Sequence, residues 1–327
     1  MRKLRRALVV GGAGFIGSRV ARILHEQGVR TTVIDDLSSG LERQVDATEL
    51  IVADIRQARL EEILLERRID AVFHLANAAY VPPSLQWPVD DLQRNAVTTL
   101  AVLEGVRKLE KPALVVYASS AAVYGEAEHM PMREDHPIQP KSPYGVSKFA
   151  SEQYLRLYSN LYEIPTLSLR LFSIYGPGQR KQVVYDLMHR AFGGENPLTI
   201  LGSPDVSRDL VFVDDAAHAF VTLARTAPAR GEAYNIASGT PTTLAELAST
   251  LLSAAALSIP VRFTGQVRPG DPLHWEGDPA RARALGVRCD TPLSEGIQRT
   301  ARWFAEAGGR QAAASAEESR DRRRVHV

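Results

Sequence analysis

A serine, a tyrosine and a lysine near the middle of the chain have the types and spacing of a proton-transfer site. Ser120 closes a short polar pair, and Tyr144 and Lys148 follow it, four positions apart. On a helix, residues four apart lie on one face, one turn from each other. An ammonium there can stabilise a phenolate, so that a tyrosine with an ordinary pKa near ~10 becomes usable as a base near neutral pH. Ser120 could hydrogen-bond the hydroxyl or carbonyl on which the tyrosine acts, and we predict all three as catalytic residues.

Three glycines near the start of the chain predict a turn that a dinucleotide could approach. The apolar run at 7–10 is too short for a helix and is typical of a strand buried on both faces. It leads directly to Gly11, Gly14 and Gly17, after which apolar residues recur at helical spacing. Glycine allows a tight turn and lets the backbone approach a pyrophosphate, which then lies at the helix N-terminus.

A pair of carboxylates indicates which dinucleotide binds. A second strand is expected at 31–34, and it ends in Asp35 and Asp36. An acidic side chain at the tip of the second strand can accept both ribose hydroxyls of NAD, and it would repel the 2′-phosphate of NADP. The sequence therefore predicts NAD as the cofactor.

The composition excludes several classes of function. The chain has 327 residues, with 39 Lys and Arg against 38 Asp and Glu. This balance creates no broad field for nucleic acid or an anionic membrane, and no apolar run approaches the ~18 residues of a transmembrane helix. The single cysteine, Cys289, rules out an internal disulfide and fits a reducing cytoplasm. The eight histidines show no paired ligand spacing, so we expect no metal site.

Strand-like and helix-like segments alternate along the first half of the chain. This alternation predicts an α/β fold with a doubly wound parallel sheet, which binds ligands beyond the carboxyl ends of its strands. After Tyr175 the pattern becomes turn-rich. The end, 306–327, lacks apolar periodicity, and we expect it to be mostly disordered. Further strands are expected at 49–52, 71–75, 113–117 and 166–171, with helices including 92–109 and 144–161.

Together, these motifs resemble the extended short-chain dehydrogenase/reductase family, and within it the NAD-dependent nucleotide-sugar epimerases and dehydratases. The resemblance implies a Rossmann-type NAD-binding domain at 1–173, to which segments at about 207–236 return, and a smaller C-terminal α/β substrate domain at 174–305. The motifs that carry it are the glycine turn, Asp35-Asp36-Leu37-Ser38-Ser39-Gly40, Asp54-Ile55, His74-Leu75-Ala76, Asn95, Ser119-Ser120, Tyr144 with Lys148, Leu169-Arg170-Leu171-Phe172, Tyr175-Gly176-Pro177-Gly178, Arg208-Asp209, Val213-Asp214-Asp215 and Arg268-Pro269-Gly270-Asp271.

The resemblance also assigns binding roles to individual residues. His74, inside an apolar strand, reads better as a core histidine than as a catalytic group. The implied contacts of NAD are Gly11, Gly14, Phe15, Ile16, Gly17, Asp35, Asp36, Ser38, Ser39, Gly40, Asp54, Ile55, Leu75, Ala76, Ala78, Asn95, Ser119, Tyr144 and Lys148.

The substrate is expected to be a nucleoside-diphosphate sugar, with a UDP-hexose favoured. Arg208 and Arg268 are candidates for holding the diphosphate, since a guanidinium fork matches its oxygens. Asp271 could orient Arg268 or bind the nucleotide ribose. His274 and Trp275 follow near the place where relatives limit the bulk of the carbon-2 substituent, which suggests a plain hydroxyl there. The predicted substrate residues are Ser120, Tyr144, Ser173, Arg208, Arg268 and Asp271.

One position indicates the type of reaction. Relatives that eliminate water or decarboxylate carry Asp or Glu near Ala122, because dehydration needs a second acid to protonate the leaving hydroxyl. Because Ala122 supplies no acid, the chemistry that remains is oxidation and re-reduction at carbon 4, that is, 4-epimerisation through a transient ketone. Three alternatives remain open: a 4-keto-sugar reductase that exchanges its cofactor, a dehydratase or decarboxylase whose acid comes from elsewhere, such as Glu126, and a non-catalytic NAD-binding sensor.

The resemblance further implies a homodimer built through a four-helix bundle. The helices would be the segment at 97–109 and the one at 144–161. Apolar side chains beyond what one sheet face can bury are expected at Leu100, Leu103, Val106, Phe149, Leu155 and Tyr158.

Overall fold

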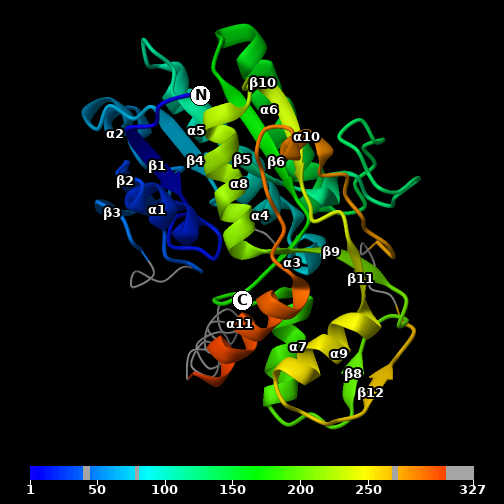
Figure 1. Cartoon of the computed structure of the whole chain (residues 1–327). Helices are drawn as coiled ribbons and strands as arrows, with labels where there is room; N and C mark the ends of the chain where they lie inside the picture. Colours follow the sequence, from blue (N-terminus) through cyan, green and yellow to red (C-terminus); the bar gives the residue numbers. More distant parts are fainter. Residues whose placement is uncertain (40–44, 78–80, 267–271, 307–327) are drawn as a thin grey trace.

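The computed structural model describes residues 1–39, 45–77, 81–266 and 272–306. A seven-stranded parallel sheet with the order β10-β6-β5-β4-β1-β2-β3 forms the larger part of the molecule (Figure 1). Helices cover both of its faces, so the predicted doubly wound parallel sheet is confirmed. Its strands are β1 (Arg6–Val10), β2 (Arg30–Asp35), β3 (Glu49–Val52), β4 (Ala71–His74), β5 (Leu114–Ser120), β6 (Thr166–Leu171) and β10 (Arg230–Ile236).

Two hydrophobic clusters lie on the two faces of this sheet. Ala7 and Val9 of β1 point into the first cluster, whereas Leu8 and Val10 point into the second. This alternation is what a strand buried on both faces requires. The first face carries α1 (Gly17–Glu26) and α8 (Val213–Thr226), and the second carries α2 (Leu60–Glu66), α5 (Thr98–Arg107) and α6 (Pro143–Tyr162).

Shorter helical elements follow strands β4 and β5 along the chain. They are α3 (Val81–Gln86), α4 (Pro88–Leu92), the π-helical turn η2 (Gln93–Val97) and the 3₁₀ turn η3 (Ala121–Val123).

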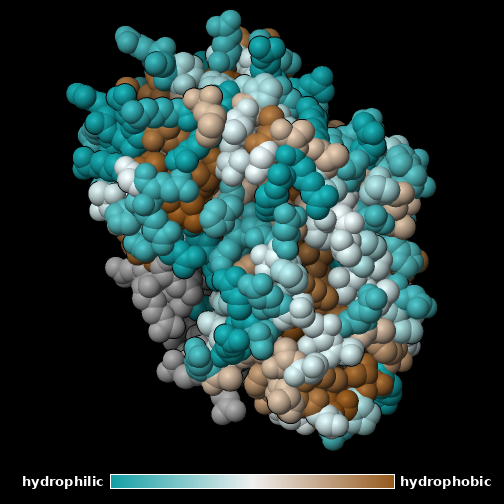
Figure 2. Space-filling model, in the orientation of Figure 1, coloured by the Kyte–Doolittle hydropathy of each residue, from teal (hydrophilic) through white to brown (hydrophobic). Residues whose placement is uncertain are grey.

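The segment after β6 builds a smaller lobe beside the carboxyl edge of the sheet (Figure 1). Within 207–236, β9 pairs with β7 and β11, whereas α8 and β10 join the large sheet. In Figure 2, apolar side chains gather at the base of this lobe, over α9 and β12. The lobe contains β7 (Ser173–Tyr175), α7 (Gln182–Phe192), β8 (Leu198–Ile200), β9 (Ser207–Phe212), β11 (Pro241–Thr243), α9 (Leu244–Ala254), β12 (Val261–Phe263) and α11 (Leu293–Ala305), whereas α10 (Ala280–Arg283) packs against β10 of the large sheet.

Part of the apolar surface expected to form the dimer interface is buried within the subunit. Leu103, Val106 and Leu155 are fully buried in the second cluster, so the prediction that they offer apolar surface is wrong. They lie on the sides of α5 and α6 that pack on the sheet. Exposed apolar side chains on the opposite side of α6 and on η2 include Val97, Val146, Tyr154, Leu157 and Leu161.

Within the described residues, none of the helices combines the length and apolar character that crossing a membrane requires.

Candidate active site

A cleft of about 390 Å³ separates the carboxyl edge of the large sheet from the smaller lobe. Ser120 and Tyr144 line it from the sheet side, and Ser173, Arg208 and Trp275 line it from the other. The two groups come from sequence segments far apart. The chain passes from β6 of the large sheet directly to β7 of the smaller lobe, with only Phe172 between the two strands. The cleft therefore combines the predicted catalytic residues with the described part of the predicted substrate site.

The glycine turn after β1 brings backbone segments into close contact, which only residues without a Cβ allow. Gly11 has a φ of +81°, and a Cβ built there would lie 2.5 Å from the backbone nitrogen of Ala76. A Cβ at Gly17 would lie 2.1 Å from the Gly11 carbonyl oxygen. Helix α1 begins directly after this turn, and no side chain caps its N-terminus. A glycine turn that leads directly into an uncapped helix N-terminus suits the diphosphate of a dinucleotide.

The two aspartates after β2 differ in their surroundings. Asp35 is buried, and it accepts hydrogen bonds from the backbone N–H groups of Ala13 (2.9 Å) and Leu37 (2.8 Å). Burial raises the pKa of Asp35, against the effect of these two bonds. Asp36 is exposed and accepts from the backbone and hydroxyl of Ser38. Because each carboxylate oxygen can accept more than one bond, Asp35 can hold the turn and still accept a ribose hydroxyl.

The other predicted cofactor residues lie along the same edge of the sheet. The Leu75 N–H donates to the Val10 carbonyl (2.8 Å), which joins the ends of β4 and β1 beside Ala76. Asp54 accepts from Arg56 through both oxygens, which lowers its pKa. Ile55 is buried, Ser39 is exposed, and Phe15 and Ile16 are half-buried at the glycine turn. Gly40 and Ala78 lie outside the described residues.

Asn95 stands in the π-helical turn η2 and is fully buried. Its amide donates to the backbone and side-chain oxygens of Asp91, each at 3.0 Å. Single π-helical turns are frequent at functional sites.

The catalytic residues meet where β5 ends against α6. Helix α6 begins with Pro143 at its first turn, and the Ser142 hydroxyl accepts from the Gly145 N–H at 3.1 Å. This start places Tyr144 at the mouth of the cleft and Lys148 one turn deeper. The Lys148 ammonium donates to the Ala118 carbonyl at 2.7 Å, and it lies 5.6 Å from the centre of the Tyr144 ring. Ser120 is half-buried beside them.

Burial dominates the electrostatics of this pair. It raises the pKa of Tyr144 to about 12, although a hydrogen bond with Ser120 opposes the shift. It lowers the pKa of Lys148 to about 7, against the opposing charges of Asp91 and Glu152. The expected lowering of the Tyr144 pKa by Lys148 is therefore wrong for the protein alone, because the loss of hydration outweighs other effects.

His74 is a core residue, as the sequence indicated. It is fully buried in β4, and its Nε2 lies 3.2 Å from the Thr99 hydroxyl. Burial lowers the pKa of His74 to about 3, so the ring stays neutral.

The substrate side of the cleft is only partly covered by the described residues. Arg208 donates through Nη1 to the carbonyls of Ser207 (2.8 Å) and Leu273 (3.2 Å), and its guanidinium lies 5.9 Å from the Trp275 ring centre. Trp275 donates to the Gly125 carbonyl at 3.2 Å. Arg268 and Asp271 lie outside the described residues.

His274 and Asp209 serve the framework of the lobe. His274 Nδ1 lies 3.1 Å from the Ser207 hydroxyl. Asp209 is fully buried and accepts from the backbone N–H groups of Ser238, Gly239 and Gly277, which ties β9 to the loop between β10 and β11 and to the segment before α10.

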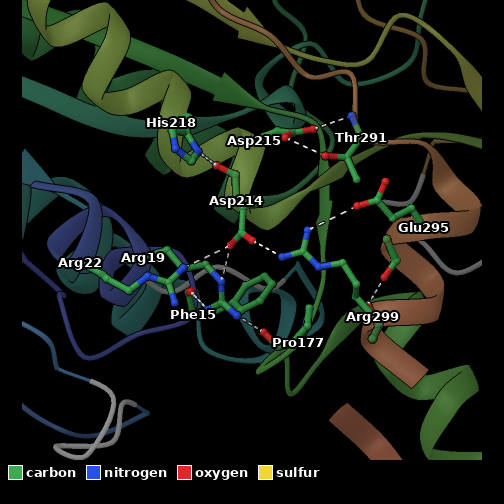
Figure 3. A network of polar contacts seen from close by, with 12 residues as sticks. Phe15, Arg19, Arg22, Pro177, Asp214, Asp215, His218, Thr291, Glu295 and Arg299 are labelled. Atoms are coloured by element: carbon green, nitrogen blue, oxygen red, sulfur yellow. Dashed lines mark hydrogen bonds and ion pairs between the residues drawn. The ribbon is translucent and has the colours of Figure 1, made fainter. Parts of the chain in front are cut away.

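A network centred on Asp214 was missed by the sequence reasoning (Figure 3). Arg19 of α1 donates to the carbonyls of Phe15 and Pro177, and its Nε lies 3.2 Å from the Asp214 carboxylate. Arg299 of α11 reaches the same carboxylate at 2.6 Å. The helix that follows the glycine turn is thereby joined to the smaller lobe. No sequence spacing could reveal this, because the members come from four distant segments.

Known proteins share this combination of fold and site. The family described as the NAD dependent epimerase/dehydratase family matches residues 7–237. The chain belongs to this family. A UDP-glucose 4-epimerase of Mycolicibacterium smegmatis is 34% identical over 309 residues, covering 91% of this chain and 98% of that protein. The predicted family and the predicted cofactor, NAD, are confirmed.

Solved structures of relatives match nearly the whole chain. That of the Thermus thermophilus UDP-glucose 4-epimerase with NAD has a TM-score of 0.85 at 32% identity, covering 92% of this chain and 99% of that one. That of a UDP-N-acetylglucosamine 4-epimerase from Methanobrevibacter ruminantium, in complex with UDP-N-acetylmuramic acid, has a TM-score of 0.87 at 30% identity, covering 93% and 99%.

Proposed function

We propose that this chain is an isomerase that epimerises a nucleoside-diphosphate sugar at carbon 4 in an NAD-dependent reaction, with a UDP-hexose as the favoured substrate. The observation that carries the proposal is the placement of Ser120 and Tyr144 on the wall of the cleft, with Lys148 buried behind them. The family and its named epimerases support the same activity.

Each catalytic side chain has a role that its position permits. Tyr144, as the phenolate, accepts the proton of the 4-hydroxyl, and Ser120 hydrogen-bonds that oxygen. Lys148 donates one hydrogen bond to the Ala118 carbonyl. Its two other N–H groups can donate to the nicotinamide ribose and toward the Tyr144 phenolate. When bound, oxidised NAD supplies the hydride acceptor and a positive charge that favours the phenolate. For the return step, Tyr144 gives the same proton back to the sugar oxygen, so the net redox change is zero.

The cofactor would lie along the carboxyl edge of the sheet. We assign the diphosphate to the glycine turn and the N-terminus of α1, and the adenosine ribose to Asp35. Asp54 and Ile55 would stand beside the adenine, and Asn95, Ser119 and Lys148 beside the nicotinamide half. The tight backbone turn that Gly11 and Gly17 permit, followed directly by the uncapped N-terminus of α1, supports this assignment.

The cleft does not favour dehydration or decarboxylation. Ala122 lies on its wall, where an acid would be needed. Glu126, the alternative acid, accepts from Lys141 at 2.9 Å and from the Leu273 N–H at 3.1 Å. Burial by itself would raise the pKa of Glu126, but these two bonds bring it below the usual value. A carboxyl held as the anion is a poor proton donor at neutral pH.

We assign the diphosphate of the substrate to Arg208, with Arg268 and Asp271 as further predicted contacts. Arg208 lies on the wall of the cleft opposite Tyr144, and its guanidinium is held by two backbone carbonyls. Ser173 would face the sugar. Trp275, fixed by the Gly125 carbonyl, gives this part of the cleft a rigid wall, and we propose that the sugar carries a plain hydroxyl at carbon 2. Faster turnover of an N-acetylhexosamine nucleotide than of its hexose counterpart would contradict this proposal.

We also propose a cytoplasmic homodimer that packs α5 and α6 of each subunit into a four-helix bundle. Val97, Val146, Leu157 and Leu161 are more than 40% exposed on these helices and on η2, and they form apolar surface that a partner would cover. Leu157→Glu should give a folded monomer by light scattering. Leu65→Glu is a matched control, because Leu65 is 52% exposed on α2, a helix that is not part of the proposed bundle. A monomeric wild-type protein at micromolar concentration would refute the dimer.

The activity is tested with the purified protein and a panel of UDP-, dTDP-, GDP- and CDP-sugars, with separation of the products. Interconversion of 4-epimers without loss of water or carbon dioxide is the expected result. A 4-keto-sugar reductase would instead release oxidised cofactor at every turnover. A sensor would bind NAD and change none of the sugars.

A further inference from the structure

Three consecutive residues at the end of β5 are each bonded to a different side chain of α6. The Ala118 carbonyl accepts from Lys148 at 2.7 Å, and the Ser119 hydroxyl donates to Glu152 at 2.5 Å. Ser120 hydrogen-bonds Tyr144. Two of these contacts involve catalytic side chains directly. The middle one, Ser119 to Glu152, does not reach the cleft.

Glu152 is itself held firmly from a third element. Arg170 of β6 donates to both of its carboxylate oxygens, through Nε at 3.0 and 3.2 Å and through Nη2 at 2.8 Å. The side chains are only 7% and 5% exposed. Arg170 Nη1 donates to the Tyr124 hydroxyl at 2.9 Å, and that hydroxyl donates to Asn235 of β10 at 2.6 Å. The carboxylate therefore ties α6 to β5 and β6, and through Tyr124 to β10.

A gain in the stability of the fold does not explain why this ion pair is buried. Removing two charges from water costs several kcal/mol per ion, and apolar residues of similar size often serve a core as well. What the ion pair provides here is a fixed geometry, because a bidentate guanidinium and a charged hydrogen bond define the carboxylate position in three directions. The carboxylate lies one turn along α6 from Lys148, on the same side of the helix.

We infer that Glu152, held by Arg170 and Ser119, is a positioning residue that sets the register between the end of β5 and α6, and thereby the place of Ser120 relative to Tyr144 and Lys148. A proton transfer between oxygens needs hydrogen-bond distances, and a misplacement of about 1 Å can cost about 10²-fold in rate. The kinetic part of the test rests on the proposed epimerase activity.

The first experiment compares Ser119→Ala with a matched control. Thr166→Val removes another buried hydrogen bond between the sheet and α6, from the Thr166 hydroxyl to the Leu155 carbonyl at 2.9 Å, away from the catalytic end. We expect Ser119→Ala to lower kcat about 10- to 100-fold with KM changed by less than about twofold. Thr166→Val should keep kcat within about twofold, although both variants lose melting temperature. Ser119→Thr keeps the hydroxyl and should restore most of kcat.

The second experiment does not depend on turnover. Lys148 is titrated by NMR of labelled lysine side chains, with its signal assigned by its absence from Lys148→Met. The charged or titratable groups around it are Asp91 of α4, Tyr144 and Glu152 of α6, Tyr117 of β5, His74 of β4 and Lys181 before α7. In Glu152→Gln the negative charge is lost, so the midpoint of Lys148, about 7 in the wild type, should move to lower pH.

The outcomes separate this inference from the proposed function. If Ser119→Ala keeps full kcat, or if Thr166→Val loses as much kcat as Ser119→Ala, Glu152 has no positioning role beyond general stability. An unchanged Lys148 midpoint in folded Glu152→Gln would also overturn the inference. If the wild type epimerises no sugar, the proposed function fails, and the Lys148 titration still decides the role of Glu152.

Discussion

Replacing Tyr144 by phenylalanine removes one oxygen atom from the centre of the site and leaves the packing of the ring unchanged. The pKa of Tyr144 in the protein alone is about 12, because the ring is buried and only 8% exposed. At pH 7 the phenolate is thus about five pH units from its midpoint, which corresponds to about 7 kcal/mol. Bound substrate and cofactor must offset this free-energy cost of forming the phenolate. Phenylalanine has no hydroxyl from which a phenolate could form. We expect Tyr144→Phe to lower kcat by at least ~10²-fold, the usual scale for a general acid or base.

The assay measures both turnover and binding. Wild type and variant are compared for interconversion of UDP-galactose and UDP-glucose, for bound NAD after purification, and for melting temperature. Bound NAD should be unchanged, and stability should change by only about 0.5–1.5 kcal/mol, the size of one hydrogen bond, here the bond with Ser120. Tyr158→Phe is the control: it removes a hydroxyl on the same helix that donates to Glu104 at 2.6 Å outside the cleft, and it should keep its activity. Activity of Tyr144→Phe within a few-fold of wild type would remove Tyr144 from the mechanism.

Three further measurements test the site. Wild type should bind NAD far better than NADP, and Asp35→Ala should narrow this preference in a direct binding titration; equal affinities in the wild type would contradict the role of Asp35. Arg208→Ala should raise KM about 10- to 150-fold with little change in kcat, because a lost bond to a charged group costs about 1.5–3 kcal/mol; a change confined to kcat would exclude it from diphosphate binding. For His74, whose pKa is about 3 in the folded protein against an ordinary value of 6.5, the unfolded chain takes up a proton first as pH falls. Stability linked to His74 is thus present above pH 6.5 and lost toward pH 3, at up to about 1.4 kcal/mol per unit. Denaturant unfolding of His74→Leu across this range should show a flatter pH dependence than wild type, and parallel curves would exclude this linkage.

The sequence by itself predicts the local features of the fold and of the site. Short apolar or β-branched segments such as 7–10, 31–34 and 71–73 predict β1, β2 and β4, because strands buried on both faces carry such residues on both sides. Gly11 and Gly17 predict the cofactor turn, since a side chain at either position would collide with backbone. The four-residue spacing of Tyr144 and Lys148 predicts a shared helix face, which depends on helix geometry alone.

Only the tertiary structure decides how these pieces work together. The periodicity of α5 and α6 shows two apolar sides on each helix, and packing on the sheet decides that Leu155 is core while Leu157 is surface. Burial, a property of the assembled cleft, sets the pKa of Tyr144 high and that of Lys148 low. The partners of Asp214 and Glu152 lie on distant segments, and no spacing along the chain encodes their contacts. Neighbouring residues determine the short-range geometry of the chain. The burial of side chains and the contacts between distant segments are set only when the chain has folded.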